Sequence, residues 1–168
     1  MSWETGDDFR LLPYLKPNTP VMPMNSDEAQ IRSLLKEFAN ALHNKDAVAA
    51  IALLAKDAVI YDLAPPLVQG PEASHDPEPL KEWFKTWKGP INSEPRDLTL
   101  DVGGDVACAY GLQHLTGART DGTTSDLWFR ATACFRREDG RWRITHMHNP
   151  VPFAMDGSDK ALLDLKPG

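Results

Sequence analysis

Two histidines near the end of the chain stand two residues apart in the segment WRITHMHNP (142–150). If this segment is a β-strand, His146 and His148 project from the same face, because residues i and i+2 of a strand lie about 6.5–7 Å apart on one side. Such a pair could exchange protons near neutral pH, where histidine titrates. It could also supply two ligands of a zinc site, with His114 or Asp62 as the third. The remaining interpretation is that both imidazoles only form hydrogen bonds across a sheet.

The direction of these two histidines depends on the strand that carries them. Trp142 and Ile144 have the same parity, and an apolar pair of this size normally faces the core. We therefore expect both histidines to point inward. A bulge near Thr145 would reverse the end of the strand and bring Met147 and Asn149 inward instead.

Asp62 directly follows the segment AVIY (58–61), and its carboxylate could act as a general base if it lies in a pocket. Desolvation disfavours the charged form of a carboxylate in an apolar pocket, and such a carboxylate can take a proton from carbon next to a carbonyl. The alternative is a turn residue whose side chain caps backbone amides ahead of Pro65 and Pro66. Both interpretations stay open at this point.

His114 lies in an expected strand and shares a face with Tyr110 and Leu112. A histidine in a pocket could polarise a carbonyl group or shuttle a proton. The alternative role is structural, in which the ring donates a hydrogen bond to a backbone carbonyl or to Tyr110.

Length and composition are those of one compact domain. The chain has 168 residues, of which 42% are apolar and 25% charged, as is typical of globular proteins. The net charge of −6 argues against a nucleic-acid partner. The arginines around the turn REDGR (137–141) alternate with acids, which is typical of a solvated hairpin tip.

The cysteine pattern and the hydropathy indicate a cytoplasmic protein. Cys108 and Cys134 show no C-x-x-C spacing, so we expect reduced thiols that pack as small hydrophobic residues. No window approaches the ~18 apolar residues of a membrane span, and the N-terminus is acidic where a signal peptide would be basic. We expect no membrane segment.

Three helices are expected in the first half of the chain. From Asn25, apolar residues follow the i, i+3, i+4, i+7 spacing of one helix face. Asp46 is placed to cap a second, shorter helix. Asp76 is placed to cap a third helix, whose buried stripe includes Trp83 and Trp87.

The second half is expected to contain only strands and turns. Alternating apolar residues and turn sequences predict successive antiparallel strands, after an earlier strand over 58–63, at 98–102, 106–117, 126–137 and 141–149. Helices followed by such strands indicate an α+β fold, in which a curved sheet wraps around helices that cover one face.

The domain is expected to span residues 25–150. A proline-rich arm (1–24) precedes it, because four prolines prevent a helix or a central strand there. A C-terminal tail (151–168) follows, and a short helix is expected over 158–165.

The order of these elements resembles the nuclear transport factor 2-like superfamily, the cone-shaped fold of ketosteroid isomerases, SnoaL-like polyketide cyclases and scytalone dehydratases. The segments that carry the resemblance are LLAKDAVIYDL (53–63), AYGLQHLTG (109–117) and FRREDGRWRITHMH (135–148). The last is especially similar to the SnoaL-like branch and to the association domain of calcium/calmodulin-dependent kinase. The resemblance covers residues 26–150 and implies a cystatin-like cone, a curved antiparallel sheet wrapped around three helices.

The resemblance also implies roles for individual residues. Asp62 stands where the isomerases carry their general base, and the face that carries His114 would point into the cone. Phe38 and Ala133 stand where the isomerases place the tyrosine and the protonated acid of their oxyanion hole. Neither can donate a hydrogen bond, which argues against steroid isomerase activity of the usual type, and the stripe position of Phe38 favours the core.

One strand is expected to turn two large side chains away from the core. Its apolar alternation places Phe129, Ala131, Ala133 and Phe135 inward and leaves Trp128 and Arg130 on the outer face. Tryptophan and arginine are enriched in protein interfaces. We therefore expect a homodimer that forms through the sheet.

The function that these observations favour is a cofactor-independent isomerase, cyclase or dehydratase acting on a small, largely apolar carbonyl compound. Asp62 would be the base, with His114 and His148 as acids or hydrogen-bond donors. No metal and no cofactor are expected. The alternative is a non-catalytic ligand-binding or dimerisation module. The expected ligand contacts are Phe38, Trp83, Trp87, Tyr110, Leu112, Ala133, His146 and Asn149.

Overall fold

The computed structural model describes residues 26–168. The expected arm over 1–24 and Asn25, where the first helix was expected to begin, therefore lie outside the described residues. Within residues 26–168, no helix is long and apolar enough to cross a membrane.

Four helices precede the long strands. They are α1 (Ser26–His43), α2 (Ala47–Ile51), α3 (Pro71–Ser74) and α4 (Pro77–Lys85). Asp46 and Asp76 cap α2 and α4 as predicted, since their carboxylates accept hydrogen bonds of 2.9 and 3.0 Å from backbone N–H groups of the first turn. The one-turn helix α3 was not predicted. Its buried Ser74 hydroxyl lies 3.1 Å from the carbonyl oxygen of Ala58, which ties this turn to the preceding strand.

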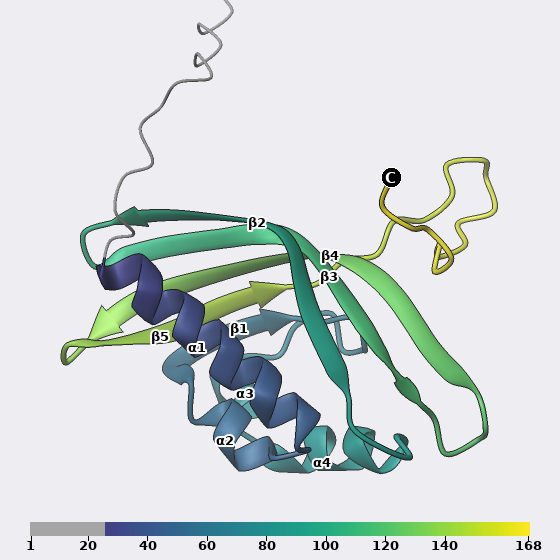
Figure 1. The fold of residues 1–168 in the computed structure, drawn as a ribbon, viewed down its shortest axis with the longest axis horizontal. Helices are drawn as coiled ribbons and strands as arrows, with labels where there is room; N and C mark the ends of the chain where they lie inside the picture. Colours follow the sequence, from purple (N-terminus) through teal and green to yellow (C-terminus); the bar gives the residue numbers. More distant parts are fainter. Residues whose placement is uncertain (1–25) are drawn as a thin grey trace, which may run out of the picture.

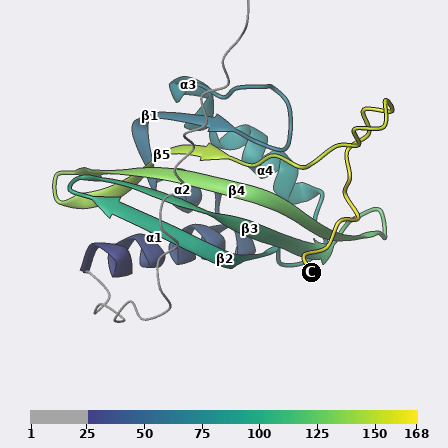
Figure 2. The same cartoon turned by 90° about the horizontal axis from the view of Figure 1, so that it is seen from above.

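Five strands form one sheet. They are β1 (Leu54–Tyr61), β2 (Asn92–Gly103), β3 (Val106–Ala118), β4 (Thr124–Glu138) and β5 (Arg141–His148), in the order β1-β5-β4-β3-β2. Strands β2 to β5 are antiparallel neighbours, as predicted. Strand β1 pairs with β5 in parallel, so the sheet is mixed. Figures 1 and 2 show this curved sheet bending over the helices, which confirms the predicted α+β fold.

Two apolar clusters fill the space between the helices and the sheet. The first cluster joins Ile31 and Leu34 of α1 to Phe135, Trp142 and Ile144 of β4 and β5. The second lies beneath α4 and contains Phe84, Trp87, Ile91, Leu115 and Phe129. Burial of these large side chains supplies the main driving force for the fold.

Strand β3 faces the helices with the side opposite to the one expected. Ala107 and Ala109 belong to the first cluster, so the residues of opposite parity lie on the outer face of the sheet. The prediction that Tyr110, Leu112 and His114 point into the cone was therefore wrong. Small alanines face the close-packed core here, whereas larger side chains occupy the outer face.

Strand β4 has the predicted orientation. Phe129 and Phe135 are buried in the two clusters, and Ala131 and Ala133 pack beside them. The outer face of this strand carries Trp128 and the exposed Arg130, as expected.

Strand β5 contains the bulge that the sequence analysis considered as the alternative. Ile144 lies opposite Phe135, but the next pair along β4 is Cys134 with His146, so Thr145 is the extra residue. Met147 therefore packs against the first cluster, and the two histidines lie on the outer face. The prediction that both histidines point inward was wrong, because parity reverses at this bulge.

The C-terminal tail contains no helix. The predicted helix over 158–165 is replaced by turns, in which Gly157 and Asp159 adopt positive φ angles of 88° and 52°. A bridge between Phe153 and Ala161 folds this part of the tail back on itself. The prediction of a helix here was wrong, since positive φ angles are incompatible with a right-handed helix.

The end of the tail returns to the outer face of the sheet, on the side away from the helices (Figure 1). Lys166 forms an ion pair of 2.6 Å with Asp126 of β4. The Arg96 guanidinium of β2 donates to the Gly168 carbonyl oxygen at 3.0 Å. The tail is thus attached to the sheet by charged side chains.

Candidate functional site

A groove lies at the edge of the sheet where β1 and β5 end. The two strands are parallel neighbours, so their C-terminal ends meet at the same edge, and Tyr61 lies opposite His148. The groove has a volume of about 400 Å³, and we call it the rim groove. Its lining residues are Tyr61, Asp62, Leu63, Ala64, Pro65, Pro66, Leu67, His148, Asn149 and Pro150.

Asp62 is exposed at the start of the loop that follows β1, and its carboxylate accepts two hydrogen bonds. One carboxylate oxygen, Oδ1, accepts hydrogen bonds from the Leu63 backbone N–H at 2.8 Å and from the Asn149 side-chain amide at 3.3 Å. The other oxygen, Oδ2, has no partner within the part of the chain that the structure describes. The residue therefore caps a backbone amide and also lines a groove with one carboxylate oxygen available to a ligand.

The two histidines of the H-x-H segment have different environments. The His146 Nδ1–H donates to the Val59 carbonyl oxygen at 2.6 Å, which holds this ring against β1. His148 is exposed, lines the rim groove, and has no hydrogen-bond partner among residues 26–168. The Tyr61 ring meets both imidazoles edge-on, with centroid distances of 4.9 Å to His146 and 5.8 Å to His148. His148 is thus the histidine that a ligand in the groove can reach.

His114 lies apart from the rim groove. Strands β4 and β5 separate its strand from β1, and its ring stacks on Trp128 with a centroid distance of 4.1 Å. Its Nε2 lies 2.6 Å from the Asp126 carboxylate. Hydrogen bonds from Lys166, and then from His114, lower the pKa of Asp126. The expected set of Asp62, His114 and His148 is therefore not assembled, and only the first and last share a groove.

The other expected ligand contacts are distributed between the core and the outer face. Phe38 and Ala133 pack against the first cluster, Trp83 packs against the second, and Trp87 belongs to the second. These side chains fill the interior of the cone. Tyr110 lies with Leu112 on the outer face, so it cannot wall an interior pocket.

The apolar wall of the rim groove was missed by sequence reasoning. Leu63, Pro65 and Pro66 belong to the loop after β1, which the sequence marked only as a turn. The Pro65-Pro66 pair shortly after the candidate base was the available signal, since prolines rigidify a loop and expose an apolar surface. Among residues 26–168, no group of three or more His, Cys, Asp or Glu side chains is placed to hold a metal ion.

The mixed curved sheet, the helices on one of its faces and the polar residues at its rim define a protein of the nuclear transport factor 2-like class, which has a cystatin-like fold. The SnoaL-like domain family matches residues 31–154. The chain therefore belongs to the SnoaL-like domain family. It matches none of the curated proteins.

Solved structures share this fold over most of the chain. A nuclear transport factor 2-like protein of unknown function from Pseudomonas putida KT2440 is 31% identical, with a TM-score of 0.73 over 84% of this chain and 96% of that chain. A protein from Novosphingobium aromaticivorans, provisionally named a scytalone dehydratase, is 15% identical, with a TM-score of 0.67 over 84% of this chain and 95% of that chain. At 15% identity, the second match shows a shared fold and nothing more.

Proposed function

We propose that this protein is a cofactor-independent isomerase or lyase that binds a small, largely apolar carbonyl compound in the rim groove. The observation that carries this proposal is that Asp62 and His148 line one groove whose remaining wall is largely apolar. A carboxylate and an imidazole that face the same space are the groups that general base and general acid catalysis require. The provisional naming of a structural neighbour as a scytalone dehydratase agrees with such chemistry.

The proposed reaction begins with removal of a proton from carbon next to the carbonyl group. Asp62 Oδ2 takes this proton, while the Leu63 N–H and the Asn149 amide hold the other carboxylate oxygen in place. The His148 imidazole donates a hydrogen bond to the carbonyl oxygen as negative charge develops there. In an isomerisation, protonated Asp62 returns the proton to another carbon. In a dehydration, it gives the proton to a hydroxyl group on the β-carbon, whose C–O bond breaks so that water leaves and a C=C bond forms.

The apolar wall contributes to the proposed reaction by excluding water. A ligand that lies against Leu63, Pro65 and Pro66 would displace solvent from the Asp62 carboxylate. A less solvated carboxylate takes up a proton more readily.

The proposal is tested by exchange of α-protons in deuterated water. The substrates are a panel of small cyclic and acyclic enones, beginning with 2-cyclohexen-1-one, and loss of the α-proton signals is followed by NMR. We expect D62N to slow the protein-dependent exchange by about 10²–10⁴-fold, as loss of a general base does. The matched control is H114Q, which should retain the wild-type rate because His114 lies away from the groove.

Two results would contradict the catalytic proposal. Equal exchange rates for the wild type and D62N would remove Asp62 as the base. Wild-type protein that binds members of the panel without accelerating exchange would favour the non-catalytic alternative, a module that only holds a ligand.

We also propose that the protein forms a homodimer through the outer face of the sheet. Tyr110 and Val106 are 46% and 58% exposed on this face, next to Leu112 of the same strand. The same face carries Asp101 and Arg130, whose guanidinium has no ion pair among residues 26–168, so two copies related by a twofold axis could place opposite charges together. Light scattering at micromolar concentration should give the mass of a dimer, and Y110E should give a monomer. A monomeric wild type would overturn this proposal.

A further inference from the structure

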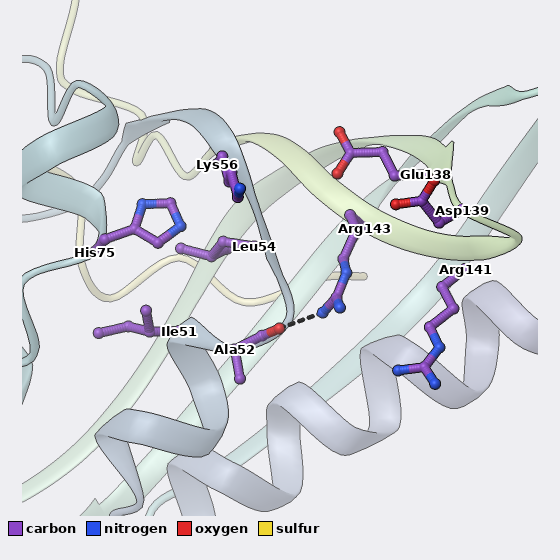
Figure 3. A pocket seen from close by; sticks show the side chains of 9 residues that line it. All are labelled: Ile51, Ala52, Leu54, Lys56, His75, Glu138, Asp139, Arg141 and Arg143. Atoms are coloured by element: carbon purple, nitrogen blue, oxygen red, sulfur yellow. Dashed lines mark hydrogen bonds between the residues drawn. The ribbon is translucent and has the colours of Figure 1, made fainter.

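A second groove lies at the opposite end of β1 from the rim groove. It is bounded by the end of α2, the start of β1 and the hairpin that joins β4 to β5, and we call it the hairpin groove (Figure 3). Its volume is about 520 Å³. None of the proposed catalytic residues lines it, so it would be a separate site.

The basic side chains of the hairpin groove are not paired with acids. Lys56 and Arg141 form no ion pair or hydrogen bond within the described part of the chain. Among residues 26–168, the Arg143 guanidinium donates only to the carbonyl oxygen of Ala52, a neutral group, and this contact holds it at the centre of the groove (Figure 3). Its other N–H groups remain available to a ligand.

Arginines in the same hairpin behave differently when they lie outside the groove. Arg136 pairs with Asp57 at 2.7 Å and with Glu138, and Arg137 pairs with Asp27 at 2.7 Å. Glu138, an acid that lines the groove, is thus already engaged by Arg136. The acids nearby are therefore partly neutralised, whereas the cations that line the groove keep their donors.

The groove also has an apolar side. Ile51 and Leu54 line it from the end of α2 and the start of β1, and both are half-buried. His75 lies beside them, with its Nδ1–H donating to the Pro71 carbonyl oxygen at 2.8 Å. That hydrogen bond fixes the ring and leaves Nε2 free to contact a ligand.

We propose that the hairpin groove binds an amphipathic carboxylate, a small molecule in which one carboxylate is attached to an apolar chain or ring. The carboxylate contacts the guanidinium of Arg143 and the charges of Arg141 and Lys56, because a planar guanidinium matches the two oxygens of a carboxylate. The apolar part lies against Ile51 and Leu54. This site is independent of the proposed reaction in the rim groove.

Asp139 provides a test in which a substitution is expected to strengthen ligand binding. It lines the groove at the tip of the hairpin, where its φ angle is 49°, and its negative charge opposes that of the ligand. Removing this charge should therefore strengthen binding, whereas removing the charges of Lys56 or Arg141 should weaken it.

The experiment is an NMR titration of the full chain with sodium octanoate, compared with 1-octanol and sodium phosphate. Octanoate should shift resonances of residues that line the hairpin groove, with an affinity at least about tenfold higher than that of either comparison ligand. We expect K56Q and R141Q each to weaken octanoate binding about two- to fivefold, in line with the energies of exposed ion pairs. D139N should strengthen binding by a similar factor.

The control variant is R130Q, which removes an unpaired arginine on the outer face of the sheet, away from the groove. It should bind octanoate as the wild type does. All of these side chains are unbonded within the described fold, so thermal unfolding should confirm that each variant is folded. If 1-octanol bound as tightly as octanoate, the basic side chains would have no role in binding. If phosphate bound as tightly as octanoate, the apolar side of the groove would have none. Equal weakening by R130Q would show a nonspecific charge effect and overturn the site.

Discussion

Met147 of β5 lies directly opposite Ala133 of β4, and both side chains pack against the first core cluster. The bulge at Thr145 makes this pairing possible, and the Thr145 hydroxyl donates to the Cys134 carbonyl oxygen at 3.2 Å. The same bulge places His148 at the rim groove. The end of β5 is therefore both a core element and a wall of the candidate site.

This arrangement predicts that truncation of two neighbouring residues changes the free energy of unfolding by unequal amounts. We expect M147A to lower the free energy of unfolding by about 1–3 kcal/mol, because it removes apolar atoms from a partly buried position. H148A should change it by less than about 0.5 kcal/mol, since this side chain is exposed and unbonded within the described chain. Urea denaturation measures both. A larger loss for H148A than for M147A would contradict the bulge.

Gly117 predicts a second stability effect. A Cβ atom at this position would lie 2.8 Å from Cζ3 of Trp87 and 3.0 Å from the Pro90 carbonyl oxygen. The Trp87 ring cannot move away easily, because it is 2% exposed and lies under the Arg119 guanidinium, 3.6 Å from the ring centroid. We expect G117A to destabilise the fold by about 1–3 kcal/mol, as overpacking does.

The matched control for this substitution is G70A. A Cβ atom at Gly70 would meet nothing within 4 Å, and its φ angle of −74° suits any residue. Thermal unfolding of the two variants should therefore separate them clearly. Equal melting temperatures of G117A and G70A would mean that the Trp87 ring leaves room for a Cβ atom at position 117.

The ion pair between Asp27 and Arg137 predicts a pH dependence of stability. The hydrogen bond from Arg137 lowers the pKa of Asp27 below its ordinary value of 3.8, against the opposing effect of burial. The folded state thus favours the charged carboxylate. Its contribution to stability is complete above the unfolded pKa and is lost as the pH falls through the lowered pKa of the folded state.

The corresponding experiment compares D27N with the wild type by urea denaturation across the acidic range. The wild type should be more stable near neutral pH, and the difference should disappear at a pH below the lowered pKa. A difference that stays constant with pH would show that the effect of Asp27 does not depend on its charge.

The cysteine pair predicts slow thiol chemistry. Cys108 and Cys134 lie directly opposite each other in β3 and β4. Burial, and then the neighbouring Cys134, raise the pKa of the Cys108 thiol above its ordinary value of 9.0. Iodoacetamide reacts with the thiolate, so alkylation of Cys108 at about pH 8 should be slower in the folded protein than in urea.

The variant C134A isolates Cys108 for this measurement. Its alkylation rate should rise, because the contribution of the neighbouring thiol is absent, and should stay below the rate of the unfolded chain because burial remains. Identical rates for the folded and unfolded chains would contradict the prediction.

The sequence predicted helices α1, α2 and α4, the antiparallel strands and the α+β arrangement because periodicity and capping residues are local signals. Asp46 and Asp76 cap helices where expected, and β4 faces the core with the predicted side. The sequence analysis also grouped Asp62 with His148, and the structure places both at one end of the sheet because Asp62 follows β1 and His148 ends the neighbouring β5.

Besides the missed helix α3, the parallel pairing of β1 with β5 and the absent helix over 158–165, the errors concern which face of a strand points inward. In β3 the inner face begins with the small residues Ala107 and Ala109, whereas the larger Tyr110 and Leu112 lie on the outer face, so side-chain size pointed to the wrong side. In β5 the reversal depends on Thr145, an ordinary strand residue whose bulge arises from pairing with β4. Both features are set by contacts between distant segments, so local patterns do not contain them.

The C-terminal tail covers part of the same outer face through which we propose that two copies associate. Asp126 holds both His114 and Lys166, and the latter pair is about half exposed to solvent. Salt weakens such exposed ion pairs. If two copies associate through this face, the tail and the second copy compete for the same part of the sheet. Ionic strength and protein concentration would then jointly decide which of them occupies it.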